Sequence, residues 1–310
     1  MKICVSGATG FIGSALMRYL ASQGAEAIAL NRTDCEAASM AASATNRNAL
    51  INKLSNADAV IHLAGRAHVL RDDKAAAPRL FNESNVELTE SLARVALEAD
   101  VKRFVFVSSI GVCGDKTTEQ PFTEDSPARP SSEYAASKLR AELRLQDLLQ
   151  GSAMEWTIIR PPMVYSANAP GNFHRLLKLV YGGVPLPFGS CMNARSMVAV
   201  ENLVSLMYAC ATHPKGKDQL FLVADITLST RALVQAIAKG MDKRPLLMPV
   251  SDSILRTALT LLNKPKLYTQ LFESLQIDSS KARRLLNWLP DDKAYLQLAG
   301  ASFKAIKQRG

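Results

Sequence analysis

A glycine-rich turn near the N-terminus is the feature that most constrains the fold. Gly7, Gly10 and Gly13 follow a short apolar run, Lys2–Ser6, and open a stretch with helical periodicity. Glycine lets the backbone of such a turn approach a pyrophosphate, and the helix N-terminus supplies N–H groups and a positive dipole. Tight turns without a ligand have similar spacing, but the first βα turn of an α/β chain is where this motif binds dinucleotides. The predicted phosphate-binding residues are Gly7, Thr9, Gly10, Phe11, Ile12 and Gly13.

The first half of the chain alternates short apolar runs with longer amphipathic stretches, which is typical of βαβ units around a parallel sheet. The runs are almost continuously apolar, as expected for strands covered on both faces. The predicted strands are Lys2–Ser6, Ala25–Leu30, Ala59–Leu63, Phe104–Ser108 and Thr157–Arg160, and the predicted helices are Phe11–Gln23, Arg47–Lys53, Val86–Ala99 and Tyr134–Gln150. Residues 33–46, rich in Ala, Ser and Thr, predict an irregular loop. We therefore expect an α/β fold with a doubly wound Rossmann sheet over residues 1–165.

The amino-acid composition of the chain changes after Pro161. Proline and glycine recur and divide the chain into short elements. Helices are predicted at Val200–Cys210, Thr230–Lys239, Asp252–Leu262 and Ser279–Leu286. We see no internal repeat and no low-complexity linker between the halves. Residues 166–310 are therefore expected to form a smaller α/β substrate-binding region, part of which returns to the Rossmann sheet.

Charge and cysteine content narrow the classes of partner. The net charge of +9 fits a nucleic acid, an anionic membrane surface or an acidic small molecule. The basic residues are scattered, so no nucleic acid is expected, and the most apolar helical stretch, Ile254–Leu262, is too short to span a membrane. Five cysteines without a CxxC pair indicate free thiols, the N-terminus shows no signal-peptide pattern, and the histidines have no metal-ligand spacing. We expect a cytoplasmic protein without a metal.

The end of the second predicted strand bears on the choice of cofactor. Dinucleotide sites usually place an acidic residue there to hold the ribose 2′-hydroxyl, whereas this chain has Asn31 and Arg32. Arg32 can pair with a 2′-phosphate, which favours NADP(H), while Asp34 close by leaves NAD(H) open. After the third strand, small residues let the backbone pass close to the adenosine and pyrophosphate. The cofactor contacts predicted there are Leu63, Ala64 and Gly65.

Tyr134 and Lys138 lie four residues apart at the start of a predicted helix, so their side chains share one face. A nearby ammonium group is expected to lower the pKa of the tyrosine, which would let it exchange a proton near neutral pH. The pattern occurs often by chance, but here it follows both the glycine turn and a strand that ends in Ser108 and Ser109. This combination predicts an oxidoreductase site.

The motifs together resemble the extended short-chain dehydrogenases of the nucleotide-sugar epimerase/dehydratase family over nearly the whole chain. The resemblance implies that Ser109 orients the substrate oxygen, Tyr134 is the acid/base and Lys138 binds the cofactor ribose. It also implies cofactor contacts from Asn85, Pro161, Met163 and Val164, and contacts to the diphosphate of a UDP-sugar from Asn172 and Arg195. Family members commonly pair through two helices that match Val86–Ala99 and Tyr134–Gln150, so a homodimer is expected. Apolar residues there, such as Leu92, Val95 and Leu143, suit an intramolecular core equally well.

The residues after Ser109 bear on the reaction. Dehydratases of this family carry an acidic pair there, and Ile110 and Gly111 cannot transfer protons, so dehydration is disfavoured. Stretches such as HLAGRAHVL, IIRPPMVY and SLQIDSSKAR resemble reductases that convert UDP-4-keto-6-deoxy-N-acetylglucosamine into UDP-N-acetylquinovosamine for O-antigen or exopolysaccharide. We therefore expect an NAD(P)H-dependent reductase acting at sugar C4. A UDP-glucose or UDP-N-acetylglucosamine 4-epimerase with tightly bound NAD is the alternative, and a non-catalytic dinucleotide sensor is a third.

Overall fold

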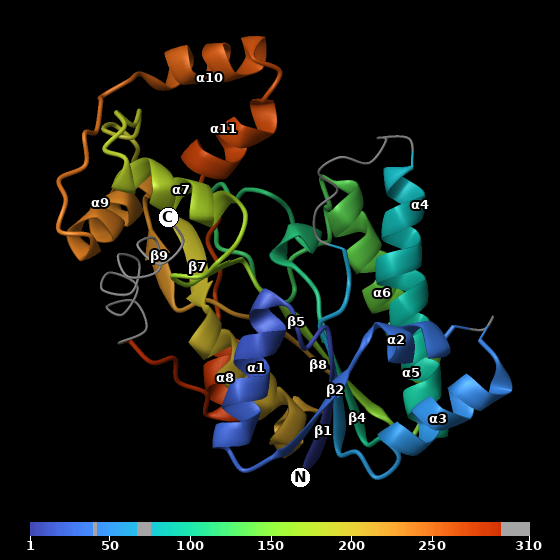
Figure 1. Cartoon of the computed structure of the whole chain (residues 1–310). Coiled ribbons are helices and arrows are strands. Elements are labelled where there is room, and N and C mark those ends of the chain that lie inside the picture. The colour runs from blue at the N-terminus through green and yellow to red at the C-terminus, as the bar shows by residue number, and fades with distance from the viewer. Residues whose placement is uncertain (40–41, 67–75, 293–310) are drawn as a thin grey trace.

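The computed structural model describes residues 1–39, 42–66 and 76–292, which form a larger and a smaller sheet (Figure 1). The larger sheet is parallel, with six strands in the order β2-β1-β3-β4-β5-β8. They are β1 (Lys2–Ser6), β2 (Glu26–Leu30), β3 (Ala59–His62), β4 (Arg103–Val107), β5 (Glu155–Arg160) and β8 (Gln219–Leu222). The smaller sheet contains β6 (Met163–Tyr165), β7 (Arg195–Ala199) and β9 (Ile226–Leu228), with β6 parallel and β9 antiparallel to β7.

Helices cover both faces of the larger sheet, because successive strand residues point to opposite sides. Ile3 and Val5 pack into a core with α1 (Phe11–Ser22), α8 (Val200–Thr212) and α12 (Ser280–Leu286). Cys4 packs into a second core on the other face. The elements of that face are α2 (Arg32–Ala37), α3 (Ala44–Leu54), α5 (Leu88–Glu98) and α6 (Glu133–Leu149). This architecture confirms the predicted doubly wound α/β fold.

The prediction of a loop over residues 33–46 is wrong at both ends of that range. α2 begins at Arg32 because Asn31 accepts a hydrogen bond from the N–H of Asp34 (2.9 Å) while the Asp34 carboxylate accepts one from the N–H of Asn31 (2.7 Å). This reciprocal capping offsets a composition that favours helix weakly. Ser43 caps α3 in a similar way, by accepting from the N–H of Asn46. Residues 40–41 lie outside the described part of the chain.

Other helices were not predicted. They are α4 (Ala77–Phe81), α7 (Asn172–Tyr181) and α11 (Pro265–Phe272), while α9 (Thr230–Gly240) and α10 (Asp252–Leu261) fall where the sequence placed helices. Leu92 and Val95 of the two proposed dimer helices belong to the core, whereas Leu143 on α6 is exposed. The homodimer stays a prediction.

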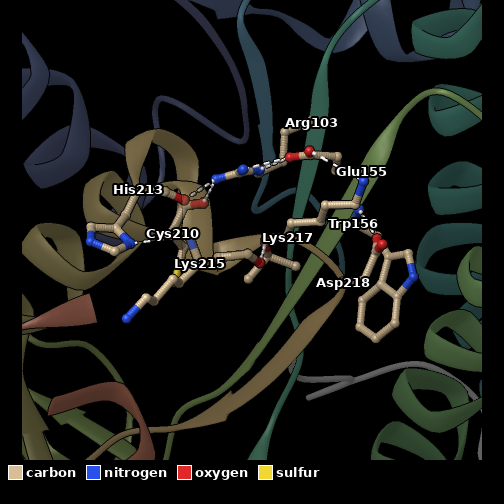
Figure 2. Close-up of polar contacts among 10 residues, drawn as sticks. Arg103, Glu155, Trp156, Cys210, His213, Lys215, Lys217 and Asp218 are labelled. Atoms are coloured by element: carbon tan, nitrogen blue, oxygen red, sulfur yellow. Dashed lines mark hydrogen bonds and ion pairs between the residues drawn. The ribbon is translucent and has the colours of Figure 1, made fainter. Parts of the chain in front are cut away.

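A buried arginine, Arg103, links the end of α8 to the amino end of the larger sheet through hydrogen bonds (Figure 2). Arg103, at the start of β4, donates to the carboxylate of Glu155 on β5 through Nε (2.8 Å) and Nη2 (2.5 Å). Its Nη1 donates to the carbonyl oxygens of Cys210 (2.7 Å) and His213 (2.8 Å), at the end of α8. One side chain therefore joins two strands to a helix that comes much later in the sequence.

The opposite, carboxyl edge of the sheet holds the predicted site. The chain runs outward from β1 to β2 and then returns to place β3 on the other side of β1. Such a reversal leaves a crevice beyond the carboxyl ends of the two strands, where ligands of open α/β sheets bind. The glycine turn follows β1, and Leu63 follows β3, so both border this crevice.

Candidate active site

The glycine turn is packed too tightly for side chains. Gly7 has a φ of +72°, and a Cβ on it would lie 2.8 Å from the backbone nitrogen of Ala64. A Cβ on Gly13 would lie 2.0 Å from the carbonyl oxygen of Gly7, so α1 can start against the turn only with glycine there. Gly10, the N-cap of α1, has no capping side chain. The first N–H groups of the helix therefore remain for an anion.

A buried chain of hydrogen bonds runs behind the turn. The Thr89 hydroxyl donates to the carbonyl oxygen of Asn85 (2.6 Å), so toward Nε2 of His62 (3.0 Å) it can only accept. His62 therefore carries its proton on Nε2, and its Nδ1 accepts from the hydroxyl of Ser6 (2.6 Å). The Ser6 oxygen in turn accepts from the N–H of Ala64 (3.3 Å). The chain joins the end of β1 to the helix that carries Asn85.

His62 is held neutral within this chain. Burial, together with the positive charge of Lys138, lowers the pKa of His62 to about 3. The imidazole therefore serves as a fixed hydrogen-bond bridge near neutral pH. Among the described residues, no group of three His, Cys, Asp or Glu side chains could hold a metal ion.

Asn85 lies in a π-helical turn, η1 (Asn82–Glu87), a distortion often found at functional sites. Its Nδ2 donates to Oγ of Ser137 on α6 (2.9 Å) and to the carbonyl oxygen of Arg66 (3.1 Å), while its Oδ1 accepts from the N–H of Arg66 (2.8 Å). A Cβ on Gly65 would lie 2.7 Å from that Oδ1. Asn85, a predicted cofactor contact, thus fixes the loop after β3 and helix α6 relative to each other.

The predicted catalytic residues meet in one cleft at the end of β1, β3 and β4. Ser109 lies just after β4. α6 begins at Glu133, because the hydroxyl of Ser132 caps the N-terminus of the helix by accepting a hydrogen bond from the N–H of Ala135 (3.2 Å). Tyr134 and Lys138 lie on the first turns of α6. The cleft has a volume of about 280 Å³ and is lined by Gly7, Gly10, Phe11, Ile12, Gly13, Leu63, Gly65, Arg66, Val107, Ser108, Ser109, Tyr134, Lys138, Pro161, Pro162 and Val164.

The electrostatics differ from the sequence-based expectation in one respect. Burial raises the pKa of Tyr134, and a hydrogen bond with Ser109 opposes that rise, so Lys138 is not the group that acts on the phenol here. Nζ of Lys138 donates instead to the carbonyl oxygen of Val107 (3.0 Å) and lies 4.6 Å from the centre of the Phe106 ring. Burial lowers the pKa of Lys138 to about 8, against the opposing charge of Glu142. The lysine is turned toward β4 rather than toward the tyrosine.

A buried ion pair below Lys138 was not predicted from the sequence. Glu142, one turn further along α6, accepts from Arg160 through Oε1 (3.0 Å) and Oε2 (2.6 Å). Nη1 of Arg160 also contacts Sγ of Cys113 at 3.3 Å. A charged residue at the end of the apolar strand β5 and a glutamate four residues after Lys138 were the available signals. The pair fixes α6, and with it the predicted catalytic side chains Tyr134 and Lys138, to the sheet.

Ser108 is a second residue that the sequence did not single out. Its hydroxyl is buried, lines the cleft beside Ser109 and has no hydrogen-bond partner among the described residues. A buried hydroxyl without a partner is costly, which fits a site where a ligand supplies the missing hydrogen bond.

Some predicted contacts do not line the cleft. Besides Asn85, they are Thr9, Asn31, Arg32, Ala64, Met163, Asn172 and Arg195. The Arg32 side chain is 92% exposed and pairs with Glu36 one turn along α2 (2.9 Å). The carboxylate of Asp34 accepts a hydrogen bond from the N–H of Asn31 and forms an ion pair with Nζ of Lys53 (2.6 Å). Both contacts use Oδ2 of Asp34, and the side chain of Glu36 is 64% exposed, so carboxylate oxygens of α2 can still contact a ribose hydroxyl.

The predicted diphosphate contacts lie near α11. Asn172 is the first residue of α7, and its Nδ2 donates to Oε1 of Gln270 (3.2 Å). Nη1 of Arg195 donates to the carbonyl oxygens of Thr269 (3.1 Å) and Glu273 (2.9 Å). Both residues thus hold α11 in place. Their role toward a diphosphate stays a prediction.

The glycine cradle, the parallel sheet and the Ser109–Tyr134–Lys138 set define an oxidoreductase of the short-chain dehydrogenase class. A family model described as the NAD dependent epimerase/dehydratase family matches residues 3–224. The chain is 38% identical over 302 residues to a UDP-glucose 4-epimerase from Vibrio cholerae, covering 93% of this chain and 90% of that protein. The chain therefore belongs to the NAD-dependent epimerase/dehydratase family.

Solved structures with the same fold support the assignment of the architecture. The UDP-glucuronic acid 4-epimerase from Bacillus cereus, in complex with NAD, superposes with a TM-score of 0.76 at 20% identity over 99% of each chain. A UDP-glucose 4-epimerase from Thermotoga maritima, with UDP-glucose, superposes with a TM-score of 0.74 at 19% identity, covering 100% of this chain and 99% of that one. In the described residues, no helix has the length and apolar character needed to cross a membrane.

Proposed function

We propose that this enzyme is an NAD-dependent 4-epimerase of a UDP-hexose. The observation that carries the proposal is the meeting of Ser109, Tyr134 and Lys138 in the cleft of the glycine cradle. The similarity to the UDP-glucose 4-epimerase of Vibrio cholerae, which extends over 93% of the chain, supports this reaction over the net reduction that we expected from the sequence.

The residues of the cleft fit a nicotinamide dinucleotide. The cradle leaves no room for a Cβ at Gly7, and the uncapped N-terminus of α1 suits a pyrophosphate. Lys138 would bind the ribose next to the nicotinamide. The chemistry that a bound dinucleotide would supply is reversible hydride transfer at a sugar carbon.

The side chains of the chain would handle the proton and the orientation of the sugar. Tyr134 would remove the proton of the C4 hydroxyl as the carbonyl forms, and would return it to the same oxygen after the sugar has presented its other face. Ser109 would hydrogen-bond that oxygen and hold it against the phenol. Ile110 and Gly111, which follow Ser109, cannot act as acids, so no residue there would eliminate water.

A second candidate is the NADPH-dependent reduction of a UDP-4-keto-6-deoxy-N-acetylhexosamine to UDP-N-acetylquinovosamine. Arg32 favours it, because an exposed guanidinium at the end of β2 suits a 2′-phosphate, for which it would leave its ion pair with Glu36. An epimerase regenerates its own cofactor, whereas a reductase consumes NADPH.

The two candidates separate in one experiment. Purified protein is incubated with UDP-glucose or UDP-N-acetylglucosamine without added cofactor, and the sugars are resolved by NMR. We expect the C4 epimer to form. If no epimer forms and NADPH is instead consumed stoichiometrically with UDP-4-keto-6-deoxy-N-acetylglucosamine, the epimerase proposal is wrong and the reductase is established.

Arg32→Ala tests the cofactor within the same assays. If the 2′-phosphate contact exists, the variant should raise KM for NADPH about tenfold and leave KM for NADH unchanged. Glu36→Ala is the matched control, because it removes the partner of Arg32 and leaves the guanidinium in place. Equal effects of Arg32→Ala on both cofactors would remove the argument for NADPH.

A further inference from the structure

Helix α10 forms the part of the described chain farthest from the larger sheet, beyond α7 (Figure 1). It packs chiefly on α11, and none of its residues is buried. Exposed helices normally carry polar side chains outward and apolar ones toward the protein. α10 also presents large apolar side chains to solvent, although its two least exposed residues, Leu255 and Leu259, are apolar as well.

Polar contacts hold α10 against its neighbour. The carboxylate of Asp252 accepts a hydrogen bond from the hydroxyl of Tyr268 on α11. The guanidinium of Arg256, one turn further on, stacks 4.8 Å from the centre of the same ring. These contacts, together with the partly buried Leu255 and Leu259, fix the orientation of α10 on α11.

The opposite face presents large apolar side chains to solvent. Ile254, Leu261 and Leu262 are 62%, 83% and 64% exposed, and their spacing places them on one side of the helix. Leu246 and Met248, on the segment that precedes α10, are 56% and 48% exposed. We call these five exposed residues, Leu246, Met248, Ile254, Leu261 and Leu262, the apolar ridge. Large apolar side chains exposed in such number on neighbouring segments of the chain are typical of an interaction site.

Basic residues flank the apolar ridge. Residues 243–268 contain five basic side chains, Lys243, Arg244, Arg256, Lys264 and Lys266, and a single acidic one, Asp252. The carboxylate of Asp252 accepts a hydrogen bond from Tyr268. Lys264 and Lys266 directly follow the most exposed leucines at the corner between α10 and α11. The surface therefore combines an apolar tip with a positive surround.

We propose that the apolar ridge docks on an anionic phospholipid bilayer. Amphipathic elements with a basic surround lie in the interface of such bilayers, with their apolar side chains among the acyl chains and their lysines at the headgroups. A second copy of the chain fits less well, because a twofold contact would bring the same excess of positive charge together. The inference is independent of the reaction and concerns where the enzyme works.

Vesicle co-sedimentation of the full chain tests the proposal. The protein is spun with vesicles of phosphatidylglycerol and phosphatidylcholine, and separately with vesicles of phosphatidylcholine alone. We expect binding to the first kind only, and release as salt is raised. Lys264→Gln and Lys266→Gln should each lower the partition coefficient about fivefold. Ile254→Ser/Leu261→Ser/Leu262→Ser should abolish binding.

Leu289→Ser provides the matched control, because Leu289 is 77% exposed and lies outside the apolar ridge. It should bind vesicles as the unaltered chain does, and all variants should keep the unaltered turnover and melting temperature. Failure of the unaltered chain to bind anionic vesicles at low salt overturns the proposal. So does equal binding to phosphatidylcholine alone. A dimer in sedimentation velocity that the triple variant dissolves, without any vesicle binding, would assign the ridge to a second copy instead.

Discussion

Each end of the parallel sheet carries a buried arginine–glutamate pair, and the two pairs have different surroundings. At the amino end, Arg103 uses its donors on Glu155 and on two carbonyl oxygens of the α8 end, and Glu155 remains partly exposed. At the carboxyl end, Arg160 and Glu142 are almost fully enclosed, with side chains 7% and 2% exposed. The first pair closes the end of a helix, while the second supports a helix whose side chains face a cleft.

The polar groups at the two ends of the sheet differ in whether they have partners within the chain or could still bind a ligand. Arg103 makes four hydrogen bonds, two to the carboxylate of Glu155 and two to carbonyl oxygens at the end of α8. At the carboxyl end, Ser108 has no partner among the described residues, and Lys138 keeps a buried charge against a lone carbonyl oxygen and an aromatic ring. A buried polar group without a hydrogen-bond partner lowers the stability of the fold, and a ligand that supplies the partner removes this loss. The polar groups that a ligand could contact therefore lie at the carboxyl end of the sheet, while the ion pairs at both ends hold the fold together.

The largest effect should come from removing the acid/base. Tyr134→Phe is expected to lower turnover about 1,000-fold or more, because no other phenol in the described cleft can exchange the proton. The melting temperature and dinucleotide binding should stay unchanged. Tyr208→Phe is the control and should retain full activity, because it removes the hydroxyl of a tyrosine on α8 that packs against Tyr19 of α1. Loss of dinucleotide binding in parallel with turnover would count against the acid/base role of Tyr134.

The next effect should distinguish the two ion pairs directly. Glu142→Gln leaves Arg160 buried without a counter-charge and should lower the free energy of unfolding by about 3–5 kcal/mol. Glu155→Gln should cost about 2 kcal/mol, because Arg103 keeps its two carbonyl partners and the site is partly solvated. Urea unfolding measures both.

Activity gives a second readout of the same pair of variants. Glu142 raises the pKa of Lys138, so Glu142→Gln should shift the alkaline limb of the pH–rate profile to lower pH. Glu155→Gln should leave that profile unchanged. Equal losses of stability together with unchanged profiles would erase the contrast between the ends of the sheet.

The smallest effect concerns the histidine behind the cradle. The folded-state pKa of His62 is about 3, below the ordinary value of about 6.5. Between these two pKa values the unfolded chain binds a proton at His62 and the folded chain does not. The contribution of neutral His62 to the free energy of unfolding is therefore fully present above pH 6.5 and is lost as the pH falls. Between pH 7 and pH 5 the loss should reach about 2 kcal/mol. His62→Gln should flatten this part of the stability profile, and an unchanged slope would show that His62 does not titrate as described.

Sequence patterns predicted the features that depend on local spacing. The glycines of the turn, the apolar strands and the i, i+4 relation of Tyr134 and Lys138 are all fixed by neighbours in the chain. Features that depend on distant partners were missed. The direction of the Lys138 side chain is set by the carbonyl group of Val107, and the pairing of Arg160 with Glu142 joins a strand to a helix. The contacts of Arg195 likewise depend on α11, which the sequence did not predict.

The sixth strand of the sheet has a consequence for the order in which the chain can mature. Until β8 has left the ribosome, β5 is an edge strand whose apolar residues Ile158 and Ile159 have an unpaired backbone beside them. Such edges recruit other chains, so the nascent protein is exposed to misassembly while the segment between Arg160 and Gln219 is synthesised. The residues that close the sheet, and the α8 end that Arg103 fastens, come from the same late stretch. A truncation before Leu222 would therefore leave behind an aggregating fragment rather than a smaller dinucleotide-binding domain.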